Sequence, residues 1–170
     1  MNFACIILAA GLSSRMSEFK PLLPFQGEPA IAKIINTVLG AGLSQIKVVI
    51  GHRAYELEPV LRGLPVSIVK NHRFAEGMFS SIVAGVSSIQ KTEIDGSKGV
   101  DGFFVLPVDV PLVSPETLRR VTESFANTTH ALISHPVYKE KRGHPPLVST
   151  RLTAPLLKWK GKNGLRGFLH

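Results

Sequence analysis

Residues 3–24 read FACIILAAGLSSRMSEFKPLLP, and this stretch decides the fold. It opens with an uninterrupted apolar run, as expected for a parallel strand that is covered on both faces. The small residues Ala9, Ala10 and Gly11 follow directly, and charged residues come after them. A buried strand that runs into such a loop is typical of α/β proteins, in which ligands bind beyond the carboxyl ends of the strands.

Apolar runs and amphipathic stretches alternate along the rest of the chain. Residues 30–39 carry the apolar stripe of a helix that packs on a sheet. Further helices are predicted at 55–62, 78–90, from 115 onward and at 152–159, and strands at 46–50, 66–69, 103–108, 131–134 and 146–149. We therefore predict an α/β fold with a mostly parallel sheet and right-handed crossovers. We expect one domain over residues 1–170, with no linker or repeat.

Composition narrows the classes of partner. The formal net charge is +8, but lysine and arginine are scattered, and only 2 tyrosines and 1 tryptophan are present. We therefore expect phosphorylated small molecules rather than nucleic acid. No apolar run approaches the roughly 20 residues that cross a bilayer, so we expect no membrane partner. Cys5 is the only cysteine, which fits a reducing cytoplasm.

The loop after the first strand has the chemistry of a polyphosphate site. Successive backbone N–H groups at Leu8, Ala9, Ala10 and Gly11 can approach a ligand closely and form an anion-binding nest. Arg15 and Lys20 add cationic groups that suit a triphosphate. The loop matches neither the P-loop pattern nor the dinucleotide fingerprint.

Asp109 is the strongest candidate for a metal ligand. It directly follows the apolar strand 103–108, and Pro107 and Pro111 stiffen the turn around it. Mg²⁺ typically uses one or two carboxylates together with substrate phosphates. Asn71 follows the third strand, where it can contact a base or ribose. Glu76, Gly77 and Met78 open the next helix, whose N-terminus can hold phosphate.

Four segments together resemble one known family. Residues 8–31, LAAGLSSRMSEFKPLLPFQGEPAI, resemble the signature of the nucleotidyltransferases related to molybdenum cofactor cytidylyltransferase, the MobA-like NTP transferases, although Ser17 replaces the usual glycine. Residues 71–86 (NHRFAEGMFSSIVAGV), 108–113 (VDVPLV) and 142–147 (RGHPPL) resemble further segments of that family in the same order. The resemblance spans essentially the whole chain.

The resemblance implies a fold, a reaction and a set of site residues. It implies a three-layer Rossmann-like fold of the nucleotide-diphospho-sugar transferase type, and Mg²⁺-dependent transfer of CMP from CTP to a phosphorylated acceptor, molybdopterin, with release of pyrophosphate. Arg15, Lys20 and Asp109 would be catalytic, with Asp109 as the metal ligand. Nucleotide contacts would come from the first loop and Asn71. Acceptor contacts would come from Glu76, Gly77, Met78, Ser80, Ser81, Arg142, Gly143 and His144.

Some features leave alternatives open. The family's second acidic motif, Asp-x-Asp-Thr-Pro, is absent, so the 170-residue chain is either shortened or completes its metal site otherwise. Ala10, where guanylyl relatives have glycine, favours CTP over GTP. A sugar- or alditol-phosphate nucleotidyltransferase is the main alternative enzyme. A non-catalytic carrier that brings nucleotide or pterin cofactor to a molybdoenzyme is the alternative from another class.

Overall fold

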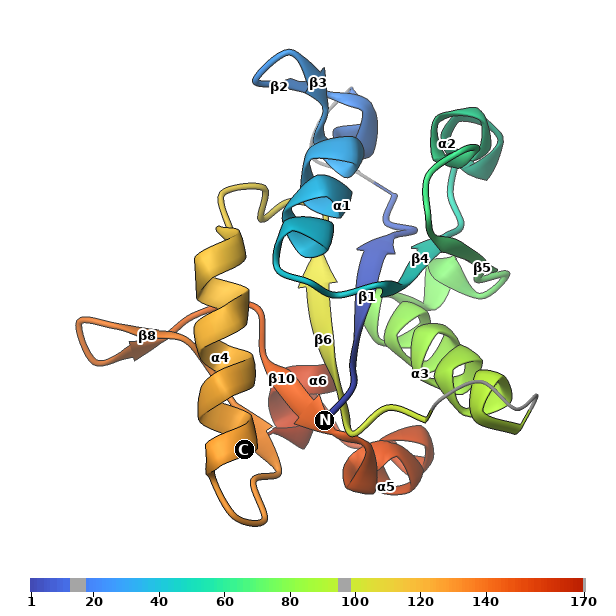
Figure 1. Cartoon of the computed structure of the whole chain (residues 1–170). Helices are drawn as coiled ribbons and strands as arrows, with labels where there is room; N and C mark the ends of the chain where they lie inside the picture. Colours follow the sequence, from blue (N-terminus) through green and yellow to red (C-terminus); the bar gives the residue numbers. More distant parts are fainter. Residues whose placement is uncertain (13–17, 95–98, 170) are drawn as a thin grey trace.

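A computed structural model describes residues 1–12, 18–94 and 99–169. Its central sheet has the strand order β5-β4-β1-β6-β10-β7. The strands are β1 (Phe3–Ala9), β4 (Gln45–Ile50), β5 (Ser67–Lys70), β6 (Gly102–Pro107), β7 (Ile133–Ser134) and β10 (Leu147–Ser149). The four strands β5, β4, β1 and β6 are parallel, and their arrowheads point to one end of the molecule in Figure 1. The predicted mostly parallel α/β sheet is therefore confirmed.

Helices cover both faces of the sheet and make a three-layer structure (Figure 1). One face carries α1 (Ala30–Gly40), α2 (Ala54–Leu61) and α4 (Pro115–Asn127). The other face carries α3 (Met78–Ile94), α5 (Thr153–Lys158) and α6 (Gly164–Phe168). None of the helices in the described part of the chain has the length and hydrophobicity that crossing a membrane requires.

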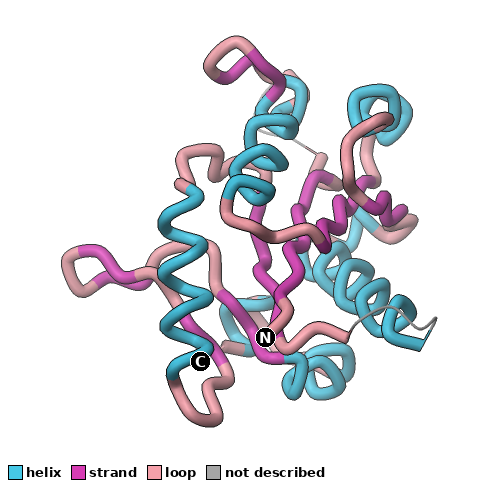
Figure 2. Tube along the Cα trace, in the orientation of Figure 1, coloured by secondary structure: helices cyan, strands magenta, loops and turns pink. Residues whose placement is uncertain are grey.

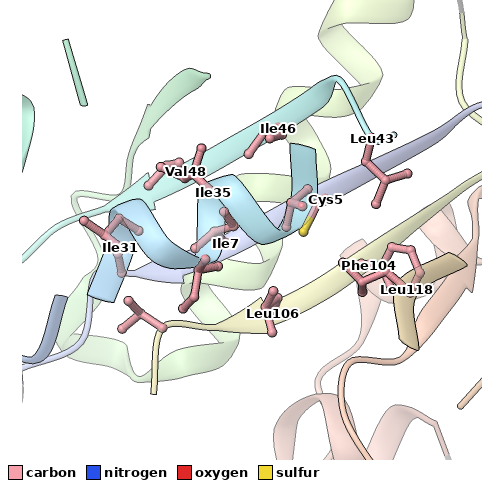
Figure 3. Close-up of a cluster of buried hydrophobic side chains, with 14 of the residues drawn as sticks. Cys5, Ile7, Ile31, Ile35, Leu43, Ile46, Val48, Phe104, Leu106 and Leu118 are labelled. Atoms are coloured by element: carbon pink, nitrogen blue, oxygen red, sulfur yellow. The ribbon is translucent and has the colours of Figure 1, made fainter. Parts of the chain in front are cut away.

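The apolar run of β1 is explained by these two layers. Successive strand side chains point to opposite faces, so Cys5 and Ile7 pack with α1 in one core cluster, whereas Ala4 and Ile6 pack with α3 in the other. Figure 3 shows the first cluster, in which side chains from three parallel strands meet α1 and α4. Burial also raises the pKa of the Cys5 thiol far above its ordinary value, which keeps this group protonated.

The end of the chain departs from the predicted order. Strand β10 is antiparallel to β6 and β7, because β7 and β10 are joined by a hairpin connection instead of a helical crossover. That connection contains the two-stranded hairpin of β8 (Val137–Tyr138) and β9 (Lys141–Arg142), which projects from the body in Figure 2. A second small hairpin, β2 (Pro24–Phe25) and β3 (Glu28–Pro29), precedes α1.

Several helix predictions need correction. Helix α3 continues to Ile94, four residues beyond its predicted end at 90, because no glycine or proline interrupts the stretch before Gly96. The predicted helix at 152–159 is a short 3-10 turn, η3 (Thr150–Leu152), followed by α5. Helix α6 was not predicted. Two further 3-10 turns, η1 (Lys20–Leu22) and η2 (Phe74–Glu76), lie in the loops after β1 and β5.

Candidate nucleotide and acceptor site

The loops that follow the parallel strands are held to one another by backbone hydrogen bonds. Val108 N donates to Leu8 O at 3.1 Å, His52 N to Ala10 O at 3.3 Å, and Asn71 N to Ile50 O at 2.8 Å. The pairing of neighbouring strands therefore continues past the strand ends. As a result, the loops after β1, β4, β5 and β6 meet at one edge of the sheet.

A cavity of about 500 Å³, here called the first cavity, opens at this edge. Its walls come from the loop after β1, from η1 and η2, from the start of α3 and from the end of β6. Its lining residues are Leu8, Ala10, Gly11, Leu12, Lys20, Pro21, Phe74, Ala75, Gly77, Met78, Ser81, Pro107, Val108 and Asp109. Predicted site residues from three distant segments thus share one hollow.

Lys20 and Asp109 face each other across this cavity. Lys20 Nζ lies 3.8 Å from Asp109 Oδ2, and the two side chains are 34% and 50% exposed. Lys20 is the first residue of η1, in which Pro21 favours the turn, and the preceding Phe19 is buried. Asp109 stands two residues beyond the end of β6. Both charged groups therefore lie beside regular elements and remain accessible to a ligand.

Close backbone approach shapes the wall next to Ala10. Gly51 follows β4, and a Cβ at this position would lie 2.7 Å from Phe74 Cβ and 3.0 Å from Ala10 Cβ. A larger residue would push the β1 loop and η2 apart. Phe74 and Ala75 line the cavity but were not predicted, although both lie within the quoted segment 71–86. Gly51 has no recognisable signal in the sequence, because the contact forms only in the folded chain.

Asn71, a predicted nucleotide contact, is held by hydrogen bonds at the start of α3. Its side chain is buried, and its amide nitrogen donates to Ser80 Oγ at 2.9 Å and to Ser81 Oγ at 3.0 Å. Its amide oxygen accepts from Arg73 N at 2.9 Å. The amide is therefore engaged within the protein, where it fixes the start of α3. Asn71 is absent from the lining of the first cavity.

The other predicted nucleotide residues divide in the same way. Leu8, Ala10 and Gly11 line the first cavity, whereas Ala9 is buried in the core against α1. Of the two serines predicted as acceptor contacts, Ser81 lines the first cavity, whereas Ser80 Oγ lies 2.8 Å from both Arg73 O and Gly77 O. Arg15 lies outside the described residues.

A second cavity, of about 830 Å³, adjoins the first and shares Met78 and Pro107 with it. It collects four predicted acceptor residues besides Met78, namely Glu76, Arg142, Gly143 and His144. The remaining lining residues are Phe79, Ile82, Val105, His135, Pro146, Asn163, Gly164, Leu165, Arg166 and Leu169. The segments 76–78 and 142–144, which are far apart in the sequence, therefore reach the same hollow.

The charge of Glu76 is already balanced at the mouth of the second cavity. Arg73 Nε and Nη2 donate to its two carboxylate oxygens at 2.7 and 2.5 Å. The hydrogen bond from Arg73 lowers the pKa of Glu76, so this carboxylate stays ionised and paired. Glu76 thus contributes little free negative charge to the cavity.

The residues present fit a Mg²⁺ ion that a nucleotide brings with it. Asp109 offers a half-exposed carboxylate on the wall of the first cavity. Among the described residues no group of three His, Cys, Asp or Glu side chains is placed to hold an ion. A single carboxylate suits Mg²⁺, which keeps waters and substrate phosphates as its other ligands.

Comparison with known proteins places this chain in a family. A family model described as the MobA-like NTP transferase domain matches residues 5–170. The chain belongs to this family. The molybdenum cofactor cytidylyltransferase of Escherichia coli (strain K12) is 32% identical over 146 residues, which cover 85% of this chain and 69% of that protein. Membership of this nucleotidyltransferase family supports a transferase activity.

Two further relatives extend the picture of the family. The bifunctional protein GlmU of Agrobacterium fabrum (strain C58 / ATCC 33970) is 33% identical over 71% of this chain, which spans only 26% of that protein. A solved nucleotidyl transferase from Methanothermobacter thermautotroptrophicus aligns with a TM-score of 0.80 and 27% identity, covering 99% of this chain and 80% of that one. The predicted nucleotide-diphospho-sugar transferase type of fold is thereby confirmed.

Proposed function

We propose that this MobA-like NTP transferase moves CMP from CTP to the phosphate of a molybdopterin-type acceptor and releases pyrophosphate. The acceptor phosphate oxygen attacks the α-phosphorus, a new P–O–P linkage forms, and the bond to the β-phosphate breaks in line with the attack. The protein needs little covalent chemistry for this exchange, because positioning and charge neutralisation supply the rate. Relatedness to the E. coli cytidylyltransferase motivates the choice of both substrates.

The observation that carries the proposal is the Lys20–Asp109 pair. These residues are far apart in the sequence, yet their charged atoms are 3.8 Å apart in one cavity at the carboxyl edge of the sheet. A cation and a hard oxygen ligand at this spacing suit a polyphosphate that carries a divalent ion.

Each residue then has a defined task. Lys20 neutralises charge on the α-phosphate, and the backbone at Ala10 and Gly11 contacts the nucleoside. Arg15 grips the leaving pyrophosphate. Asp109 would hold Mg²⁺, which would supply positive charge to the phosphate oxygens. Asn71 acts indirectly, because its amide fixes Ser81 and the start of α3 next to the first cavity.

The second cavity suits the acceptor. It shares the lining residues Met78 and Pro107 with the first cavity, so an acceptor bound there would lie beside the nucleotide. The side chains of Phe79, Ile82 and Val105 form an apolar part of the lining. Such a surface favours a flat heterocycle over the hydroxyl-covered ring of a sugar phosphate. The product would then pass to a molybdoenzyme.

The choice of base depends on a single methyl group. Ala10 is 2% exposed and lies in the wall of the first cavity, where a glycine would leave more room. We therefore infer that CTP is preferred over the larger GTP. Turnover of the two nucleotides with molybdopterin tests this inference, and faster turnover with GTP rejects it.

The reaction itself is tested by incubating the protein with Mg²⁺, CTP labelled at the α-phosphate, and molybdopterin. We expect labelled dinucleotide and pyrophosphate in equal amounts, and neither product when EDTA removes the metal. Mg²⁺-dependent CTP binding in calorimetry without pyrophosphate release would instead identify a carrier. Turnover of sugar phosphates but not of molybdopterin would show that the acceptor is a sugar phosphate.

A further inference from the structure

We propose that Arg166, on the short helix α6, works with Arg142 as a guanidinium pair that binds the phosphate of the acceptor in the second cavity. This inference rests on the proposed function, because it assumes that a phosphorylated acceptor enters this cavity. Arg166 lies outside all the segments that the sequence motifs single out. Both arginines line the second cavity, and they come from separate parts of the chain.

The position of α6 on the cavity wall is set by packing. The chain turns into α6 through two left-handed residues, Asn163 (φ 66°) and Gly164 (φ 53°). Phe168 then packs edge-on against Trp159, with ring centroids 5.7 Å apart. A Cβ at Gly167 would lie 2.1 Å from Lys162 O, so only glycine allows the helix to sit this close to its own entry turn. Helix α6 is therefore anchored rather than loosely attached.

The charges of the second cavity favour an anion. Its one carboxylate among the described residues, that of Glu76, is bonded at both oxygens to Arg73. Neither Arg142 nor Arg166 forms an ion pair within the part of the chain that the structure describes. By contrast, Arg53, Arg73, Arg119 and Arg120 are all paired with glutamates. The cavity thus keeps two cations that no carboxylate neutralises.

The combination of groups defines the ligand. Arginine binds phosphate through two parallel N–H donors, and two guanidiniums can enclose a dianion. Leu165 and Leu169 of the α6 segment extend the apolar lining beside Phe79, which suits the flat ring that carries the phosphate. Because the cavity shares the lining residues Met78 and Pro107 with the first one, an acceptor bound in it would lie beside the nucleotide.

The test compares a phosphorylated pterin with its unphosphorylated counterpart. Binding of 6-hydroxymethylpterin monophosphate and of 6-hydroxymethylpterin is measured by pterin fluorescence for the wild type, Arg166→Gln and Arg142→Gln. We expect each substitution to weaken binding of the phosphorylated probe by about 10- to 100-fold, the effect of losing a hydrogen-bonded charge. The unphosphorylated probe should bind all three proteins within about 2-fold, because it has no charge to lose.

Arg62→Gln is the matched control. Arg62 directly follows α2, lines neither cavity among the described residues, and has no ion-pair partner there. Arg62→Gln lowers the net charge as much as Arg166→Gln or Arg142→Gln does. If Arg62→Gln binds the phosphorylated probe like the wild type, the losses in the other two variants come from local contacts and not from long-range attraction. Calorimetric titration with Mg²⁺ and CTP should give wild-type affinity for Arg166→Gln, which shows that the first cavity is intact.

The outcomes separate this inference from the proposed function. If the wild type converts molybdopterin but Arg166→Gln keeps its acceptor KM, the inference is wrong and the function stands. If molybdopterin is not converted but the phosphorylated probe still binds in an Arg166-dependent way, the phosphate-binding role of Arg166 is supported and the proposed reaction is wrong. Equal probe affinity in the wild type and in a folded Arg166→Gln protein, or no preference of the wild type for the phosphorylated probe, overturns the inference.

Discussion

The first and second cavities differ in what holds their walls. The first is built where parallel strands end, and backbone hydrogen bonds such as Val108 N to Leu8 O tie its loops together. The second depends on the hairpin connection before β10 and on α6, a helix of 5 residues that is anchored mainly by side chains. The position of the first cavity thus follows from the sheet, whereas the second cavity depends on segments outside the parallel strands.

This contrast matches the demands of the two substrates. A triphosphate with its metal needs charges at fixed positions, and the segments that follow β1 and β6 provide them at Lys20 and Asp109. An acceptor is recognised by shape and charge, which loops and short helices can change without disturbing the sheet. We therefore expect changes in the first cavity to act on rate, and changes in the second to act on acceptor affinity.

The largest effect is expected for Asp109→Asn. The substitution keeps the size of the side chain but removes the charge proposed to hold the metal, so the rate should fall by at least about 10³, roughly 4 kcal/mol of barrier. Initial rates of pyrophosphate release measure this loss. Thermal unfolding should be unchanged, because the side chain is 50% exposed and its one ion pair within the described residues is the long contact with Lys20.

The same strand supplies the control for this experiment. Asp101 stands just before β6, at the opposite end from Asp109, and its carboxylate accepts a hydrogen bond from Asn2 N at 2.7 Å. Asp101→Asn should therefore keep the rate. Near-normal activity of Asp109→Asn would show that Asp109 does not hold the metal. A similar loss of rate in both variants would show that the two ends of the strand do not differ in their effect on the reaction.

A somewhat smaller effect is expected for Lys20→Met. The apolar chain is retained and the ammonium is lost, so the rate should fall by about 10², roughly 2.7 kcal/mol of barrier. Affinity for CTP should fall less, because Lys20 is proposed to act on charge that grows as the α-phosphate reacts. Steady-state kinetics and calorimetry measure the two quantities, and Lys160→Met on the exposed surface controls for net charge. An equal fall in affinity and rate would make Lys20 a simple binding residue.

The features that the sequence predicts best are those set by periodicity and by strand order. The unbroken apolar run of β1 predicts burial on both faces, and the core clusters on either side of Ile6 and Ile7 confirm it. The placement of Lys20 and Asp109 at one edge follows from the rule that parallel strands end together. These predictions need only local sequence patterns and strand order, so most of the first cavity can be predicted from the sequence.

The features that the sequence does not predict depend on tertiary contacts. Helix α6 is too short to show a helical period, and its place is fixed by packing of Phe168 on Trp159. The partners of Asn71 are equally invisible, because Ser80 and Ser81 approach its amide only after η2 turns the chain back. An asparagine that looks available in the sequence is therefore already engaged in the fold.

Asn71→Ala tests whether this residue supports the site or touches the ligand. The change leaves the hydroxyl groups of Ser80 and Ser81 and the N–H of Arg73 without their partner, so the free energy of unfolding should fall by about 2 kcal/mol. Urea unfolding followed by circular dichroism measures this loss, with the exposed Asn127→Ala as the control. Unchanged stability together with a large loss of CTP affinity would instead make Asn71 a direct nucleotide contact.

The smallest effect is expected for Ser114→Ala, which separates stability from chemistry on the segment that carries Asp109. This segment is held at its start by Val108 N bonded to Leu8 O, and at its end by Ser114, whose Oγ accepts from Thr117 N at 3.1 Å and caps α4. Loss of the cap should lower the free energy of unfolding by about 1 kcal/mol. The rate should be retained, because the bond at Val108, next to Asp109, is untouched. A rate loss larger than the stability loss would show that α4, and not the sheet alone, positions the carboxylate.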